Sequence, residues 1–257
     1  MEEKTTDKTP EKPKKSKWLL WTCGSCGCLV IIIMVALFSL RSFTGFNIGK
    51  FFDNSQNNGS NLDEEDKEMT KSELIDYFVG ETTVYPGFDK SIKVMKWEKP
   101  VVTISVADTP PEGGIKAIDD FINKFNNNST KTKLQRIESD GDIKIYFQVS
   151  TDGAAGRSGP SSGADYIIDH ANIKLSEEAA MFDQSLSSVL SHEIFHALGF
   201  TGHYQGSACR LMSPTVCGSR LTINEERLIQ MLYSTDMPDG INESEIRSFL
   251  QNWSPNN

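Results

Sequence analysis

Histidine is scarce in this sequence, because only four of the 257 residues are histidines. Three of these four lie within twelve residues, in the stretch Ser191–Gly206, which reads SHEIFHALGFTGHYQG. Such clustering is improbable by chance in a chain so poor in histidine. The stretch is therefore the first candidate for a functional site.

Basic residues are outnumbered, with 26 Lys and Arg against 35 Asp and Glu and a net charge of −9. The first 17 residues hold six lysines and four acidic residues, so the remaining chain carries a net charge of −11. Partners such as nucleic acid or anionic lipid need clustered Lys and Arg. The acidic remainder argues against both.

Charged residues are absent between Trp18 and Leu40, a run of 23 residues that is long enough to cross a bilayer. Lysines crowd the segment before this run, and only Arg41 follows closely. The positive-inside rule predicts a single-pass protein of the cell membrane with a cytoplasmic tail at 1–17 and an extracellular remainder. The alternative is a cleaved signal peptide, but the preceding segment is long and no clear cleavage motif follows.

The five cysteines fall into two groups. One group, in or beside the predicted span, consists of Cys23, Cys26 and Cys28. We interpret these as small residues that pack well in a membrane helix and that could be acylated. The alternative is a metal or redox role for their C-x-x-C pattern. Cys209 and Cys217 lie outside the membrane in the predicted topology. An oxidising exterior favours a disulfide between them over two free thiols.

The histidine spacing indicates a metal site. On a helix, His192 and His196 are four residues apart and share one face, so a single ion can bind both. Glu193 lies beside that face without being needed as a ligand. Gly199 can adopt the left-handed conformation that ends a helix, and the resulting turn brings His203 back towards the other two. H-E-x-x-H on a helix is typical of zinc hydrolases.

The full string H-E-x-x-H-x-x-G-x-x-H, followed by Met212 nine residues after His203, resembles the metzincin clan of zinc endopeptidases. The likeness is strong over Ser188–Gly218 and architectural over Lys99–Asp183. Tyr204, directly after the third histidine, does not match the matrixins, adamalysins, astacins or serralysins, so the family within the clan stays unassigned.

The resemblance implies a Zn²⁺ cofactor bound by His192, His196 and His203, with Met212 in a turn beneath the metal. It also implies an endopeptidase that hydrolyses peptide bonds of protein or peptide substrates, and the topology predicted from the apolar run makes this enzyme membrane-anchored and extracellular. The nucleophile would be a zinc-activated water, with Glu193 as general base.

The order of apolar patterns predicts an α/β (α+β) domain. The resemblance implies a metzincin-like zincin fold with a mixed twisted sheet, an active-site helix and a C-terminal helix, and the apolar run at 18–40 adds one transmembrane helix before it. The predicted divisions are a tail at 1–17, the membrane span at 18–40, a spacer and N-terminal extension at 41–98, and a catalytic domain at 99–257.

The predicted elements are a short helix at 72–79, a strand at 101–108, a helix at 114–125, a strand at 143–150, a Gly/Ser loop at 153–163, one or two strands at 164–175, the motif helix at 177–198, and a helix that opens with a capping box at Thr222 and Glu225. In the clan, the last strand before the motif helix borders the cleft, which would be 164–175 here.

Several alternatives stay open. In one alternative, the protein is a zinc-containing cell-surface binding domain. In another, it is a zinc hydrolase with a non-peptide substrate. His170 is interpreted as a solvated histidine at the end of a strand, with a structural metal ligand as the alternative. Glu225 or Glu226 is an alternative third zinc ligand, although His203 makes it unnecessary. The sequence does not indicate an oligomeric state.

Overall fold

The structure is a computed structural model, and it describes residues 67–83, 93–148, 154–176, 183–206, 208–214 and 220–254. The predicted tail, the predicted membrane span and the cysteines within it lie outside these residues, as does Cys217. Within the described segments, no helix is both long and apolar enough to span a membrane.

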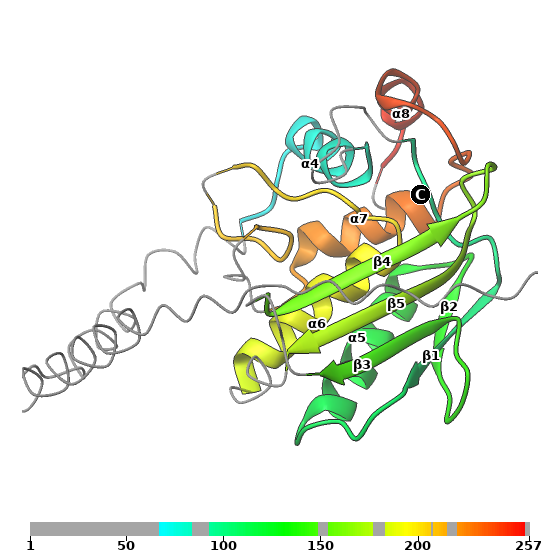
Figure 1. The fold of residues 1–257 in the computed structure, drawn as a ribbon. Coiled ribbons are helices and arrows are strands. Elements are labelled where there is room, and N and C mark those ends of the chain that lie inside the picture. Colours follow the sequence, from blue (N-terminus) through cyan, green and yellow to red (C-terminus); the bar gives the residue numbers. More distant parts are fainter. Residues whose placement is uncertain are drawn as a thin grey trace, which may run out of the picture. The chain divides into compact units, whose positions relative to one another are not determined.

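The described residues form a mixed α/β fold with one five-stranded sheet and five helices (Figure 1). The strands are β1 (Val101–Val106), β2 (Lys133–Arg136), β3 (Ile143–Gln148), β4 (Gly156–Ser162) and β5 (Ile168–Ser176). The helices are α4 (Lys71–Thr83), α5 (Gly114–Asn128), α6 (Asp183–Ala197), α7 (Ile223–Tyr233) and α8 (Glu243–Leu250).

The strands are ordered β2-β1-β3-β5-β4, with β1 parallel to β2 and β3, and β3 parallel to β5. Only β4 runs antiparallel, against β5, and it forms one edge of the sheet. Helices α5 and α6 pack on one face of the sheet, and α7 packs against α5 (Figure 1). Along β5, Ala171, Ile173 and Leu175 are buried while Asn172 and Lys174 between them are exposed, so the other face of this strand is open to solvent.

The predicted α/β class and mixed sheet are confirmed, but two assignments are wrong. The predicted loop at 153–163 contains strand β4, whose glycines, serines and Pro160 lack the apolar alternation that indicates a strand. This strand forms because its backbone pairs with β5, and not because it buries a row of apolar side chains. Because β4 takes the edge, the last strand before the motif helix, β5, lies inside the sheet and does not border the cleft as expected.

Other differences concern extent. The predicted strand pattern at 164–175 gives a single strand that begins at Ile168, and the motif helix is described from Asp183. The short strand β2 and helix α8 were not predicted, so α7 is not the last helix of the chain. The capping box at Thr222 and Glu225 is confirmed at the start of α7.

Helix α4 comes from the predicted N-terminal extension, yet it shares the core of the sheet and the other helices. Leu74 and Phe78 are fully buried in that core. The backbone N–H of Gly202 donates to the carbonyl of Glu81 at 2.7 Å. A Cβ on Gly202 would overlap α4, so only glycine permits this approach. Helix α4 therefore packs directly against the segment that leads to His203.

The C-terminal end of α6 turns the chain sharply. The N–H of Phe200 donates to the carbonyl of Phe195 at 3.2 Å, and the N–H of Gly199 donates to that of His196 at 3.0 Å. This pair of bonds is the Schellman motif, which requires a left-handed residue, and Gly199 has φ of 100°. A Cβ there would also overlap the carbonyl oxygen of Met95.

Two buried side chains satisfy carbonyl groups at this helix end. The indole Nε1–H of Trp97 donates to the carbonyl of Ala197 at 2.9 Å, and the hydroxyl of Tyr233 donates to that of Leu198 at 2.6 Å. Helix ends leave such carbonyls without intrahelical partners. The turn is thereby fixed to the core as well as to its own backbone.

We expect Gly199→Ala to lower the free energy of unfolding by more than about 2 kcal/mol, because it adds both a left-handed strain and a steric overlap. Gly80→Ala is the control, since a Cβ at Gly80 meets no atom within 4 Å and alanine favours a helix. Urea unfolding of the two variants measures the difference. Equal stability of the two variants would contradict the role assigned to this turn.

Candidate metal centre

The three clustered histidines converge in space. The Nε2 atom of His196 lies 3.0 Å from that of His192 and 3.3 Å from that of His203. The first two side chains come from one face of α6, as their four-residue spacing predicts, and the third follows the Gly199 turn. Among the described residues, no other His, Cys, Asp or Glu belongs to this group.

Backbone carbonyls fix the orientation of the two helical rings. His192 places Nδ1 at 2.7 Å from the carbonyl oxygen of Leu211, and His196 places Nδ1 at 2.6 Å from that of Phe200. A carbonyl oxygen can only accept, so each neutral ring carries its proton on Nδ1 and keeps a bare lone pair on Nε2. Two bare nitrogens 3.0 Å apart cannot share a hydrogen bond, and they are placed so that they could bind one cation together.

Burial keeps these rings neutral. It lowers the pKa of His192 to about 4, with a further lowering by His203 and a partial opposition from the Leu211 carbonyl. Burial, then His192, lowers the pKa of His196 to about 3. The pKa of His203 is lowered by burial too, although this ring is only partly covered. All three rings are thus in the form that binds metals at neutral pH.

The spacing fits zinc. A tetrahedral zinc ion with Zn–N bonds of about 2.0–2.1 Å holds its ligand nitrogens about 3.3 Å apart. The observed separations of 3.0 and 3.3 Å are close to this value. Neutral imidazoles with carbonyl partners on the far nitrogen are the usual zinc-ligating form. His192, His196 and His203 therefore fit the predicted Zn²⁺.

Glu193 is buried beside the cluster, with 6% of its surface exposed. Its Oε2 atom has no hydrogen-bond partner among the described residues. Burial raises the pKa of this carboxyl to about 8, and the positive charge of Arg157 opposes the rise. A buried carboxyl oxygen without a partner costs free energy, so Glu193 is a candidate for a role other than stability.

The edge strand β4 runs against Glu193. A Cβ on Gly156 would lie 2.7 Å from both Cγ and Oε1 of Glu193, and 2.8 Å from Cγ1 of Val189. Only a glycine lets the strand approach this closely. Gly156 was not predicted as a site residue, because its polar, glycine-rich surroundings lack the apolar alternation that indicates a strand.

The turn that contains Met212 connects the first and third histidines. The carbonyl of Leu211 accepts from His192, and the carbonyl of Met212 accepts the N–H of Tyr204 at 2.7 Å. Met212 itself is fully buried. The turn therefore holds both the ring of His192 and the backbone directly after His203.

The remaining candidates lie apart from the cluster. His170 is exposed on β5 and pairs with Asp169 at 2.5 Å. Glu225 is fully buried, accepts from Thr222 in the capping box and accepts from the hydroxyl of Tyr77 at 2.9 Å. Neither it nor Glu226 belongs to the histidine group. Cys209 is disulfide-bonded, and its pairing with Cys217 stays a prediction because the latter lies outside the described residues.

Comparison with known proteins adds no assignment. No family model matches the sequence, and no curated protein is significantly similar to it. Any statement about function therefore depends on the motif and on the geometry of the site.

We expect the folded full-length protein to bind one Zn²⁺, and His196→Ala to lose it, because two ligands hold zinc poorly. His170→Ala is the matched control, since it removes an exposed histidine outside the group, and it should retain the metal. Elemental analysis after dialysis measures the content. Absence of zinc from folded wild-type protein supplied with zinc would contradict the assignment.

Proposed function

We propose that this protein is a zinc-dependent endopeptidase of the metzincin type. The observation that carries the proposal is the convergence of the Nε2 atoms of three histidines next to a buried carboxyl group whose Oε2 atom has no partner among the described residues. Zinc bound there would polarise the carbonyl of a peptide bond and acidify a water molecule. The described residues supply three ligands, which is the number typical of catalytic zinc, whereas structural zinc has four.

Glu193 has the position of the general base. It follows the first histidine directly on α6, and its Oε2 atom has no partner among the described residues. The charge of a bound zinc ion would lower its raised pKa, so that the ionised carboxyl could accept a proton from water. The same carboxyl can return that proton to the amine that leaves. A carboxyl committed to hydrogen bonds, such as that of Glu225, could not do this without losing its partners.

The position of strand β4 favours a peptide as the substrate. It is the last strand in the order, so its outer edge has no strand partner among the described residues. An extended peptide that added to this edge would run past Gly156 and therefore past Glu193. Such pairing reads the peptide backbone, which suits an endopeptidase more than a hydrolase of small molecules.

We further propose that the site faces the exterior of a cell. The disulfide at Cys209 is typical of proteins in oxidising compartments. The predicted span at 18–40 would anchor the domain to the membrane, with the tail at 1–17 in the cytoplasm. The acidic remainder of the chain again argues against nucleic acid as a partner.

Glu193→Gln should leave zinc bound and the fold intact, yet lower peptide hydrolysis by about 10²–10⁴-fold, because the general base is lost. Hydrolysis of a mixed peptide library with and without chelator provides the assay, and elemental analysis the metal content. If wild-type protein cleaves a peptide and Glu193→Gln cleaves it equally fast, the proposed mechanism is wrong. If neither cleaves and both bind zinc, a binding domain becomes the better explanation.

Gly156→Ala should lower hydrolysis by about 10- to 100-fold with zinc retained, because the new Cβ displaces Glu193 or the edge strand. The matched control is Gly159→Ala on the same strand, where a Cβ meets nothing within 4 Å. The measurement is kcat/KM for one peptide with all three proteins. Equal loss in both variants would point to a general effect on β4, and no loss in either would remove Gly156 from the site.

A further inference from the structure

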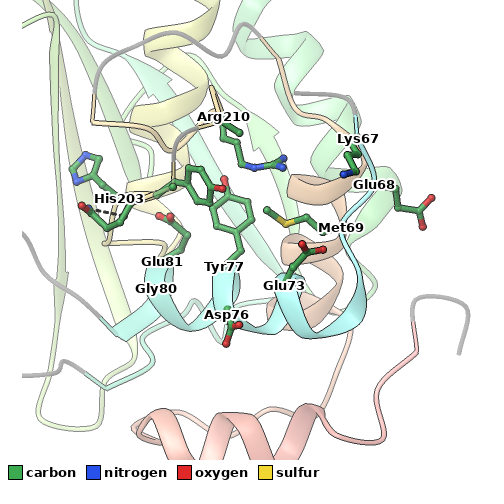
Figure 2. Close-up of a pocket in the computed structure, with 14 residues that line it drawn as sticks. Lys67, Glu68, Met69, Glu73, Asp76, Tyr77, Gly80, Glu81, His203 and Arg210 are labelled. Atoms are coloured by element: carbon green, nitrogen blue, oxygen red, sulfur yellow. Dashed lines mark hydrogen bonds between the residues drawn. The ribbon is translucent and has the colours of Figure 1, made fainter. Parts of the chain in front are cut away.

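A cavity of about 460 Å³ adjoins the metal centre (Figure 2). It lies between α4 and the described residues that follow the third histidine, up to Arg210, and His203 forms part of its wall. The volume is within the range of about 300–1,000 Å³ of small-ligand sites. Because a metal ligand lines it, any group held in the cavity lies next to the atoms that would react.

One carboxyl in the wall has no partner. Glu81 is fully buried, and neither of its carboxylate oxygens has a hydrogen-bond partner among the described residues. Figure 2 shows its side chain directed from α4 towards the His203 side of the cavity. The other acidic side chains of the wall have partners: Glu73 accepts from Thr70, Asp76 pairs with Arg247, and Glu68 pairs with Arg227.

The side chain of Glu81 lies in a negative electrostatic environment. Burial, then the nearby carboxyl of Glu225, raises the pKa of Glu81 well above its usual value, and a cation bound beside it would lower that pKa and favour the ionised carboxylate. The guanidinium of Arg210 lies instead over the rings of Tyr77 and Tyr204, at 5.8 and 5.3 Å from their centroids. In Figure 2, Glu81 is on the His203 side of Tyr77, and Arg210 is on the other side.

We propose that this cavity binds the side chain of a lysine or arginine of the peptide substrate, next to the bond that is cleaved, with Glu81 as its counter-charge. The inference rests on the proposed function and adds a substrate class to it. A cationic group would supply the hydrogen-bond donors that both oxygens of Glu81 lack. The rings of Tyr77 and Tyr204, 5.1 Å apart and edge to face, offer an apolar and aromatic wall for the aliphatic stem.

The test compares pairs of peptides that are identical except for lysine or its neutral analogue norleucine on either side of the cleaved bond. The full-length zinc-loaded protein should cleave the lysine peptide with a kcat/KM about 10- to 100-fold higher than the norleucine peptide. Glu81→Gln should reduce that ratio to near one. The matched control Asp76→Asn removes the same charge from an exposed residue of the same cavity and should keep the ratio.

A second measurement does not depend on cleavage. Binding of the same peptides to the Glu193→Gln protein should show the same preference for lysine, and Glu81→Gln in that background should abolish it. Because Gln replaces a buried carboxyl that has no partner, Glu81→Gln should also unfold at the same temperature as the wild type or higher.

The two proposals fail in different ways. If no peptide is cleaved, the proposed function fails, and the binding measurement still decides the role of the cavity. If lysine and norleucine peptides are cleaved or bound equally by the wild type, or if Glu81→Gln keeps the preference, Glu81 does not recognise a cationic side chain and the inference is wrong.

Discussion

The reversal of the chain at Gly199 is the constraint on which the candidate site depends. An α-helix can present two histidines on one face, but a third in the same direction requires the chain to leave the helix and return. The turn achieves this within a few residues because Gly199 adopts φ of 100° and carries no Cβ to collide with Met95. Hydrogen bonds from Trp97 and Tyr233 hold the same helix end in the core.

Orientation of the histidine rings comes from backbone groups around that turn. The carbonyl of Phe200, one residue after Gly199, accepts from His196, and the carbonyl of Leu211 accepts from His192. Both bonds leave the lone pair of Nε2 directed into the cluster. The tautomer of each ring is therefore set by the fold before any metal binds, which lowers the cost of assembling the site.

The three glutamates that are buried among the described residues are of two kinds. Glu225 is fully satisfied, because it caps α7 and accepts from Tyr77, and its role is explained by stability. Glu193 and Glu81 are buried with carboxylate oxygens that no described residue satisfies, and both lie beside the histidine cluster or the cavity next to it. Unsatisfied polar groups are costly, and natural proteins concentrate them at functional sites.

Features that depend on residues close together in the chain could be predicted from the sequence alone. The four-residue spacing of His192 and His196, the turn at Gly199 and the capping box of α7 follow from helix geometry and backbone conformation, so they were predictable. The mixed α/β order was also predictable, since apolar periodicity reports which residues face a core.

Tertiary structure alone decided the features that depend on distant segments. Strand β4 exists through backbone pairing with β5, and its glycines and serines gave no periodic signal. Its position at the edge placed Gly156 against Glu193, and the packing of α4 against Gly202 placed Glu81 in the wall of the cavity. Such contacts join residues up to about 120 positions apart, and side-chain pattern within one segment cannot encode which other segment will lie beside it.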